Sequence, residues 1–360
     1  MERTALATID LAALRHNLSV AKQTAPDSQV MAVIKANAYG HGLLEVAEAL
    51  SAADAFAVSC LEEAVALRGV TEKRIVVLQG FHSREQISLF SNHSLEPVIH
   101  QAWQVSALLD TPLSKAIAVS IKVDTGMHRL GINVDGVQTQ VSALRACKYV
   151  RDIQLMTHMA SADELDKDAT TLQIASFNKL AEKYDFPCSM ANSAALLGWP
   201  QSRVEWVRPG IMLYGVNPFV KGEGSDCGLK PAMTLSTRLI AVNECRKGDR
   251  IGYGGQWECP ENMRIGIAAI GYGDGYPRHA VSGTPVLING HRCHLVGRVS
   301  MDMLTLDLTG LPEAAVGDEV VLWGRGLPAE EIAIHSGTIA YELLCNVYGR
   351  VNYDYINKEG

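Results

Sequence analysis

A lysine follows an apolar, strand-like run near the start of the chain. Residues 32–42 read AVIKANAYGHG, so Lys35 closes a run of β-forming residues and precedes a cluster of small ones. A lysine that apolar neighbours partly desolvate has a lowered pKa and can form an imine or act as a general base. The alternative interpretation is an exposed lysine just beyond a strand end. Tyr39 and the glycines of GHG, which allow a ligand to approach the backbone closely, come directly after it.

Two later segments carry residues that are suited to binding a phosphate group. MANSAALLGWP places Asn192 and Ser193 directly after one apolar run, and WVRPGIMLYG places Arg208, Gly210 and Ile211 after the next. Hydroxyl groups and backbone amides near a helix N-terminus bind phosphate well. A reactive lysine opposite such a phosphate site indicates a phosphorylated aldehyde as the cofactor, pyridoxal 5′-phosphate (PLP).

The elements that must position these residues alternate between short apolar runs and amphipathic stretches, from about residue 30 to 215. Eight such runs separated by helical segments are typical of a TIM barrel, and an open doubly wound sheet is the competing fold. We favour the barrel because its last runs give no sign of a sheet edge. Lys35 then lies at the carboxyl end of the first strand, on the catalytic face of this fold. The predicted strands are 29–36, 55–59, 74–80, 95–100, 118–124, 153–158, 188–192 and 204–210.

The sequence beyond residue 213 has a different pattern. Residues 214–231 are rich in Gly, Asp and Pro and are interpreted as a linker or long loop. Beyond them, strand-like runs alternate with turn signals, which predicts an antiparallel β-domain with one late helix near 332–347. We predict a PLP-binding (β/α)8 barrel at 10–229 and a β-domain at 230–360. The opening strand, residues 1–9, is assigned to the β-domain.

Composition is that of an ordinary globular protein. The 360 residues are 48% hydrophobic and 20% charged, and a chain of this length exceeds one compact core. The net charge of −7 has no basic block, so no nucleic-acid partner is predicted. No run approaches the ~20 apolar residues of a membrane span, and the charged N-terminus does not resemble a secretory signal. Eight scattered cysteines without a C-x-x-C pair indicate reduced thiols and a cytoplasmic location.

The segment HRCH, at residues 291–294, brings two histidines and a cysteine together. It alternates as a strand does, which places His291 and Cys293 on one face and His294 on the other. We therefore predict no metal site.

Eight motifs resemble those of the alanine racemase family, fold-type III PLP enzymes. They run in the family's order from residue 32 to 303, so the resemblance covers most of the chain and both predicted domains. It implies a homodimer that interconverts L- and D-alanine. The motifs are AVIKANAYGHG, KVDTGMHRLG, THMASADE, NSAALLGW, WVRPGIMLYG, IGYGGQW, GYGDGYPR and VGRVSMDM.

The resemblance implies a role for each matched residue around the cofactor. Lys35 would bind PLP covalently and act as one catalytic base. Tyr253, in IGYGG, would come from the partner subunit and act as the second base on the opposite face of the substrate. Arg208 would hydrogen-bond the pyridine nitrogen, and His158 would bridge that arginine and the tyrosine. The residues implied to hold the phosphate are Tyr39, Ser193, Gly210 and Ile211.

Further matched residues would surround the substrate. Arg129 would contact the phenolic oxygen of PLP and the substrate carboxylate, and Lys122 would orient that arginine through a carbamate. The backbone N–H of Met301, which precedes Asp302, would also bind the carboxylate. The residues implied to line the substrate entrance are Tyr272, Arg298 and Asp163.

Physical chemistry agrees with these implied roles. Removing an α-proton at neutral pH requires delocalisation of the resulting charge, which PLP provides. An arginine at the pyridine nitrogen stays charged and keeps that nitrogen unprotonated, which weakens the electron sink and disfavours transamination. Inversion then needs a base on each face of the substrate. A tyrosine base needs a lowered pKa, which a neighbouring His–Arg pair can supply.

One position departs from the family pattern and leaves alternatives open. Some members carry a pocket tyrosine immediately before the arginine of a C-terminal motif, where this chain has Gly349 and places Tyr348 one residue earlier. A wider pocket makes a broader alanine and serine racemase the first alternative, because a steric filter of one small group is worth only ~1–3 kcal/mol. Cell-wall precursor (peptidoglycan) synthesis and alanine catabolism both stay open as metabolic contexts.

Two other functions compete with racemisation. A PLP-dependent amino acid decarboxylase shares the two-domain plan, but such enzymes usually place an acidic residue where this chain has Arg208. A non-catalytic PLP-binding protein would leave the β-domain and Tyr253 without a purpose.

Overall fold

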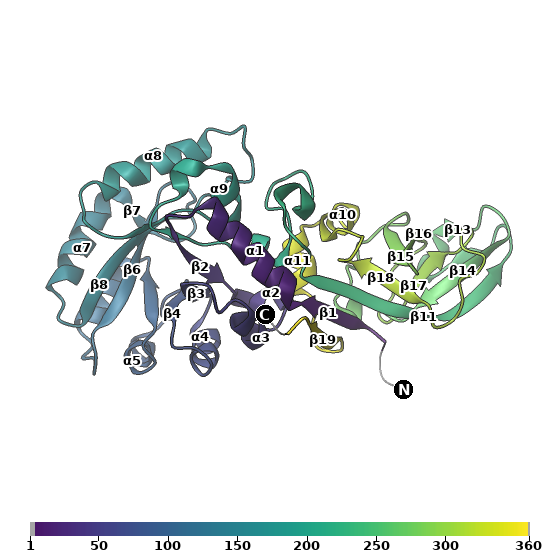
Figure 1. Ribbon diagram of the computed structural model, residues 1–360, viewed down its shortest axis with the longest axis horizontal. Coiled ribbons are helices and arrows are strands. Elements are labelled where there is room, and N and C mark those ends of the chain that lie inside the picture. Colours follow the sequence, from purple (N-terminus) through teal and green to yellow (C-terminus); the bar gives the residue numbers. More distant parts are fainter. Residues whose placement is uncertain (1–3, 359–360) are drawn as a thin grey trace.

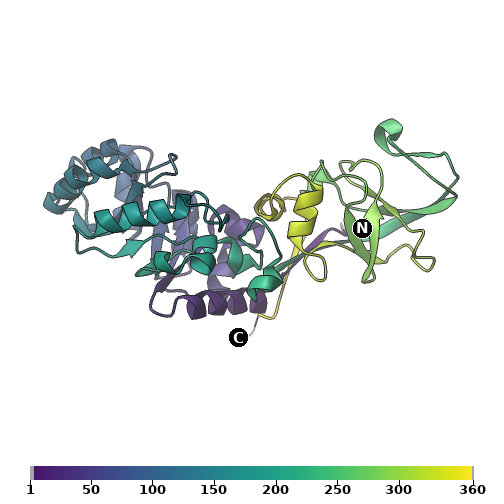
Figure 2. The same cartoon turned by 90° about the horizontal axis from the view of Figure 1, so that it is seen from above.

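The structure is a computed structural model that describes residues 4–358. A helix-covered barrel and a β-rich domain lie side by side along the long axis of the molecule (Figure 1). Seen from above, the same two bodies remain distinct (Figure 2). Among the described residues, no helix is both long and apolar enough to cross a membrane.

Eight parallel strands of the described chain close into a barrel. Their order is β5-β4-β3-β2-β10-β9-β8-β6, and β5 pairs with β6 to complete the circle, while β7 extends the far side of β6. This closure confirms the predicted TIM barrel and excludes the open doubly wound sheet. The strands are β2 (Gln29–Val33), β3 (Ala55–Val58), β4 (Arg74–Val77), β5 (Glu96–Ile99), β6 (Ile117–Asp124), β7 (Ile132–Asn133), β8 (Val150–Met156), β9 (Cys188–Ser189) and β10 (Trp206–Val207).

Most barrel strands end earlier than the sequence predicts, while β6 ends at Asp124 as predicted. β2 ends at Val33 rather than at residue 36, and β10 contains only Trp206–Val207. The residues beyond these ends leave the sheet and turn into the mouth of the barrel. Lys35 therefore lies in a turn just beyond the end of β2, and not within the strand itself.

Helices cover the outside of the barrel (Figure 1). In α1, buried Leu11, Leu14 and Leu18 follow one another at helical spacing, and the Asp10 carboxylate caps the helix by accepting from Ala12 N at 2.9 Å. The helices are α1 (Leu11–Thr24), α2 (Lys35–Gly40), α3 (Leu43–Ala49), α4 (Leu61–Arg68), α5 (Ile87–Asn92), α6 (Ala102–Leu109), α7 (Val137–Ala146), α8 (Ala169–Ala181) and α9 (Ser193–Gly198). Short 3-10 turns are η1 (Arg84–Gln86), η2 (Val134–Gly136), η3 (Pro200–Ser202), η4 (Ile211–Tyr214) and η5 (Gly224–Cys227).

The second body is a mainly antiparallel sheet in the order β14-β17-β16-β15-β18-β11-β1-β19, with β14 also pairing with β11. This confirms the predicted antiparallel β-domain. Stacked Tyr276 and Trp323, both buried, lie in its core with ring centroids 6.0 Å apart. The strands of this sheet are β1 (Leu6–Asp10), β11 (Met233–Cys245), β14 (Met263–Ala268), β15 (Pro285–Ile288), β16 (His291–Leu295), β17 (Leu304–Asp307), β18 (Glu319–Trp323) and β19 (Asn352–Ile356). In the same body, β12 (Arg250–Ile251) and β13 (Trp257–Glu258) pair with each other in a separate sheet.

Strand β1 joins the start of the chain to its end. It pairs antiparallel with β11, where Leu6 lies opposite Ser236, and parallel with β19, where Leu6 lies opposite Asn352. The assignment of residues 1–9 to the β-domain begins with residues 1–3, which lie outside the described part of the chain.

The predicted single late helix at 332–347 is wrong. The structure has two short helices there, α10 (Ala329–His335) and α11 (Ala340–Cys345). The first helix ends before Gly337, which takes the left-handed conformation with φ 63°. A glycine in this conformation is a common helix terminator because it has no Cβ to clash.

Helix α11 packs against the barrel mouth at Gly40. A Cβ on Gly40 would lie only 2.1 Å from the backbone oxygen of Leu344, and φ at Gly40 is +81°. Tyr353, in β19, donates its hydroxyl to the Gly40 carbonyl at 2.9 Å. The β-domain therefore supports the turn that carries Lys35.

Replacing Gly40 by alanine is expected to destabilise the protein more than an alanine at a glycine in open space. Gly283 is the matched control, because its φ is +94° and a Cβ added there would have no atom within 4 Å. We expect Gly283→Ala to cost about 1 kcal/mol of unfolding free energy, and Gly40→Ala about 2–4 kcal/mol, since the second change adds a backbone clash to the same strain. Thermal unfolding of both variants measures the difference, and equal losses would contradict the packing described.

Candidate active site

The segment that carries Lys35 is a left-handed turn. Within α2, the residues from Ala36 to Tyr39 have φ between 52° and 54°, a conformation that L-residues other than glycine rarely adopt. Each such residue costs on the order of 1–2 kcal/mol, so a run of them requires support from outside the turn. Strained backbone of this kind collects at functional sites.

Glu63 supplies that support from the first turn of α4. Its Oε1 accepts from Ala36 N at 2.6 Å and from Asn37 N at 3.4 Å, and its Oε2 accepts from Ser59 N at 2.8 Å. One carboxylate therefore satisfies backbone donors of two consecutive barrel loops. Sequence reasoning missed Glu63, although an acidic residue in the first turn of the helix after a barrel strand was a visible signal.

Lys35 faces other cationic groups across the barrel mouth. Burial lowers the pKa of the Lys35 amine, and the charge of Arg129 lowers it further. Burial and the charges of Arg208 and Arg129 likewise lower the pKa of Lys122 to about 8. Burial, followed by the charges of Arg208 and Lys122, holds the pKa of His158 well below its usual value. The structure thus brings these five predicted residues into one electrostatic cluster, in which His158 is neutral at pH 7.

Arg208 is buried at the centre of this cluster without a carboxylate partner among the described residues. Its guanidinium donates to Ser189 Oγ, to the Thr157 carbonyl at 2.5 Å and to the Met190 carbonyl at 3.2 Å. Burial lowers its pKa to about 10, which still leaves it charged at neutral pH. A buried cation that is held only by neutral acceptors is suited to an electron-rich acceptor such as a ring nitrogen.

Ser193, Gly210 and Tyr39 converge at the start of α9. Ser193 Oγ accepts from Gly210 N at 2.8 Å and from Met212 N at 3.3 Å. A Cβ on Gly210 would lie 2.7 Å from the hydroxyl oxygen of Tyr39, so only glycine leaves room for that side chain. The Tyr39 ring stacks on Tyr214 at 4.7 Å, which fixes its direction. Ile211, the first residue of η4, follows Gly210 directly and is buried, as Tyr39 and Ser193 are.

Asn192 has a structural use in the same segment. Its side-chain oxygen caps α9 by accepting from Ala195 N at 2.9 Å. Its predicted contact with a cofactor stays a prediction.

Three other predicted residues, Tyr253, Tyr272 and Met301, lie on the β-domain and are exposed, whereas Asp163 lies on the barrel between β8 and α8 and is half-buried. Tyr253 opens the turn η6 (Tyr253–Gly255) and is 71% exposed, and Tyr272 opens η7 (Tyr272–Asp274). Met301 lies beside the second turn, because its carbonyl accepts from Gly273 N at 2.9 Å. Within residues 4–358 the Met301 N–H forms no hydrogen bond, so this donor is available to a ligand. Arg298 donates to Gln256 at 2.7 Å, next to the turn of Tyr253.

The chain by itself does not bring Tyr253 to Lys35. No hydrogen bond, ion pair or electrostatic contact joins the two among the described residues, and Tyr253 faces outward from its own domain. The structure does bring Cys345 and Tyr341 of α11 to the barrel mouth, and sequence reasoning missed both. The Cys345 thiol lies near enough to Lys35 to raise the pKa of that amine, and the Tyr341 ring lies 6.1 Å from that of Tyr39.

The segment HRCH forms β16. Cys293 is buried, while His291 and His294 are exposed. Among residues 4–358, no three His, Cys, Asp or Glu side chains are arranged to hold a metal ion.

Removing the carboxylate of Glu63 is expected to loosen the turn of Lys35. Glu63→Ala leaves three backbone donors without their partner, and we expect a loss of about 1–3 kcal/mol of unfolding free energy. Glu62→Ala is the matched control, because Glu62 is an exposed neighbour on the same helix that bonds none of these donors, and its loss should stay within about 0.5 kcal/mol. Chemical denaturation of both variants tests this, and a similar effect of the two would refute the role of Glu63.

Comparisons with known proteins agree with this geometry. The family models described as alanine racemase N-terminal domain and C-terminal domain match residues 9–218 and 232–355. An alanine racemase of Nitrosococcus oceani is 53% identical over 347 residues, which cover 96% of this chain and 97% of the relative.

Solved structures give the same result. The biosynthetic alanine racemase from Pseudomonas aeruginosa superposes with a TM-score of 0.96 at 46% identity, covering 98% of this chain and 99% of that one. The alanine racemase from Bartonella henselae, described with covalently bound pyridoxal phosphate, has a TM-score of 0.90 at 28% identity over 98% of this chain and 99% of that one. The resemblance seen in the eight motifs is confirmed, and the chain belongs to the alanine racemase family.

Proposed function

We propose that the protein is a PLP-dependent racemase that interconverts L- and D-alanine. The main support is that one barrel mouth holds both a lysine with a lowered pKa, Lys35, and a buried arginine, Arg208. This arginine has no carboxylate partner among the described residues. Alanine racemase family models match both domains, and the relatives are named alanine racemases. These matches support racemisation over the decarboxylase and the non-catalytic alternatives.

The residues at the barrel mouth fit PLP. Lys35 would hold the cofactor covalently, because a lowered pKa leaves more of its amine neutral and nucleophilic. Ser193, the Gly210 and Ile211 backbone and the Tyr39 hydroxyl would hold the phosphate, where Gly210 leaves space beside Tyr39. Bound PLP supplies an electron sink that acidifies the α-proton of an amino acid. Arg208 would donate to the ring nitrogen and keep it unprotonated, which limits the reaction to proton transfer.

Two bases would act on opposite faces of the substrate α-carbon. Lys35 removes or returns the proton on one face. Tyr253 does so on the other face from the partner subunit, which agrees with its outward-facing, 71% exposed position on the β-domain. Neutral His158, next to Arg208, would bridge that arginine and the oxygen of the tyrosine. The proposal therefore includes a homodimer, since each site needs a residue from both chains.

Three further groups would hold the substrate. Arg129, one of the groups around Lys35, and the unbonded N–H of Met301 would bind the carboxylate, and exposed Tyr272 would line the entrance. At Gly349, which has no side chain, a Cβ would meet no atom within 4 Å. Because the pocket tyrosine of some family members is missing at this position, the proposal includes slow turnover of serine beside alanine. A cytoplasmic location and a supply of D-alanine for peptidoglycan are part of the same proposal.

A heterodimer of two inactive chains tests both the bases and the shared site. Lys35→Ala and Tyr253→Phe homodimers are each expected to lose at least about a thousandfold in racemisation of L-alanine, while Tyr149→Phe, a tyrosine on the barrel, retains it. A purified Lys35→Ala/Tyr253→Phe heterodimer should recover about half of the wild-type rate per dimer, because one of its two sites has both bases.

The readout is the formation of D-alanine, and of D-serine in parallel, from the L-enantiomers. An inactive heterodimer would show that Tyr253 does not act across a subunit boundary. Full activity of Lys35→Ala homodimers would overturn the proposed function itself.

The lowered pKa of Lys122 gives a separate test of carbamylation. At a pKa of about 8, roughly half of this amine is neutral at pH 8, and a neutral amine adds CO2 to form a carbamate with release of a proton. In 13C-bicarbonate we expect a carbamate NMR signal at pH 8 that is lost at pH 6, where the amine is protonated. Lys122→Met should lack the signal and Lys148→Met, an exposed lysine, should retain it. A signal that persists in Lys122→Met would disprove the assignment.

A further inference from the structure

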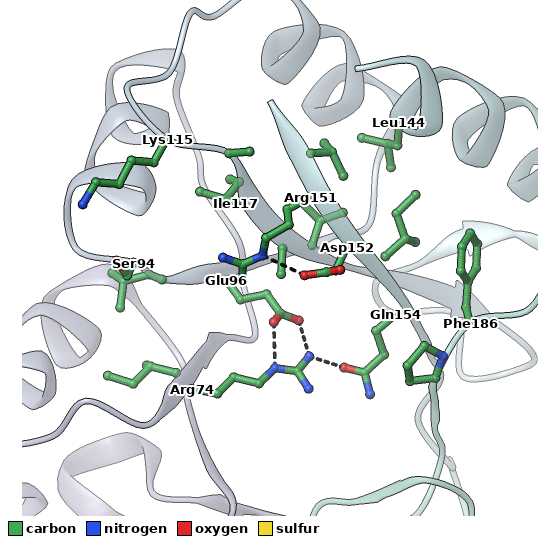
Figure 3. A pocket seen from close by; sticks show the side chains of 18 of the residues that line it. Arg74, Ser94, Glu96, Lys115, Ile117, Leu144, Arg151, Asp152, Gln154 and Phe186 are labelled. Carbon is green, nitrogen blue, oxygen red and sulfur yellow. Dashed lines mark hydrogen bonds and ion pairs between the residues drawn. The ribbon is translucent and has the colours of Figure 1, made fainter. Parts of the chain in front are cut away.

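A cavity lies at the opposite end of the barrel from Lys35. It has a volume of about 900 Å3 and is lined where the strands begin, by residues such as Gln29 of β2, Arg74 of β4 and Glu96 of β5 (Figure 3). Because the strands are parallel, their amino ends gather at this face and their carboxyl ends at the other. The cavity is therefore separate from the site proposed for PLP.

A polar network crosses the floor of this cavity (Figure 3). Arg74 donates from Nε and Nη2 to the two oxygens of Glu96, at 2.7 and 2.6 Å, and from Nη2 to Gln154 Oε1 at 2.5 Å. Ser120, on the strand between them, donates to Glu96 Oε1 at 2.5 Å. Glu96 is 4% exposed and Gln154 is 3% exposed. Arg74 thus balances the charge of Glu96, and both carboxylate oxygens of Glu96 already accept hydrogen bonds.

Two donors of this network have no partner among the described residues. Gln154 Nε2 is buried and forms no hydrogen bond, and Arg74 Nη1 forms none either. The orientation of the Gln154 amide is fixed, because Arg74 can only donate and therefore faces the amide oxygen. The amide nitrogen must then point elsewhere, and both atoms belong to residues that line the cavity. A buried donor without an acceptor costs about 1–3 kcal/mol, and this cost applies to Gln154 Nε2, whereas the Arg74 side chain is 27% exposed.

The surroundings of these donors favour an anion with an apolar part. Six cationic side chains line the cavity against four carboxylates. Its walls include Ile117, Phe186 and Trp206, and the Arg74 guanidinium lies over the Trp206 ring, 4.6 Å from its centroid. The volume is within the range of small-molecule sites, which combine apolar walls with a few polar groups that fix orientation.

We propose that this cavity binds a small organic carboxylate. The carboxylate oxygens accept hydrogen bonds from Gln154 Nε2 and Arg74 Nη1, and the hydrocarbon part packs against the apolar wall. The site lies on strands β6 and β8, which carry Ser120 and Gln154 toward this end of the barrel. Toward the other end, β6 carries Lys122, and His158 follows just beyond β8. A ligand here occupies the barrel without competing for the space at Lys35.

Calorimetric titration of the PLP-loaded enzyme with benzoate tests the proposal. We expect benzoate to bind the wild type. Gln138→Met, which changes an exposed glutamine of α7 outside the cavity, is the control and should bind equally well. Gln154→Met keeps the side-chain volume but lacks the donors, so its binding should be roughly ten- to hundredfold weaker. Inorganic phosphate is the second ligand and should bind more weakly than benzoate, since it cannot use the apolar wall.

Two results would overturn the proposal. One is equal benzoate affinity of Gln154→Met and the wild type, and the other is phosphate binding as tight as that of benzoate. A crystal structure of the wild type with benzoate gives a check that does not depend on the folding of any variant. It should show the carboxylate within hydrogen-bond distance of Gln154 Nε2, and benzoate found only at Lys35 would sink the proposal.

Discussion

Burial of positive charge at the barrel mouth is the constraint on which the rest of the site depends. A buried charge without a counter-ion costs several kcal/mol, and Arg208 meets this cost with the Thr157 and Met190 carbonyls and the Ser189 hydroxyl. Such acceptors must be held rigidly, which a closed barrel of parallel strands does. The same desolvation lowers the pKa values of Lys35 and Lys122, so one physical cause sets the chemistry of several side chains.

The barrel and its reactive lysine could be predicted because both leave local signals. Strands buried on both faces are continuous apolar runs, and Lys35 interrupts such a run at its end. The left-handed turn from Ala36 to Tyr39 could not be predicted, because none of these residues is a glycine and only Asn37 is of a type that is enriched at positive φ. Its cause is Glu63, more than twenty residues away, and tertiary contact overrides local preference there.

Other parts of the site depend on contacts that no single segment encodes. Tyr253 could be matched only through the family resemblance. It faces outward from the β-domain and does not contact Lys35 of its own chain, so its position in the sequence gives no sign of a catalytic role. Glu96 and Gln154 are polar residues within apolar runs, and the sequence gives no reason to connect them. Only the closing of the barrel places them around Arg74. The two ends of one barrel thus carry different polar chemistry, one organised by buried Arg208 and the other by half-buried Arg74.

The pairing of β1 with β19 also constrains how the chain is made. Leu6 and Asn352 are neighbours in the sheet, so β1 can form this pairing only after β19, which is synthesised much later, has been made. The barrel strands contact partners much closer in sequence and can assemble earlier. Until β11 is made, β1 is an unpaired strand next to a folding barrel, and such strands are sites of mispairing between chains. The order of synthesis therefore favours completion of the barrel before the β-domain closes, and Tyr353 of the β-domain supports the turn of Lys35 only once β19 has been made.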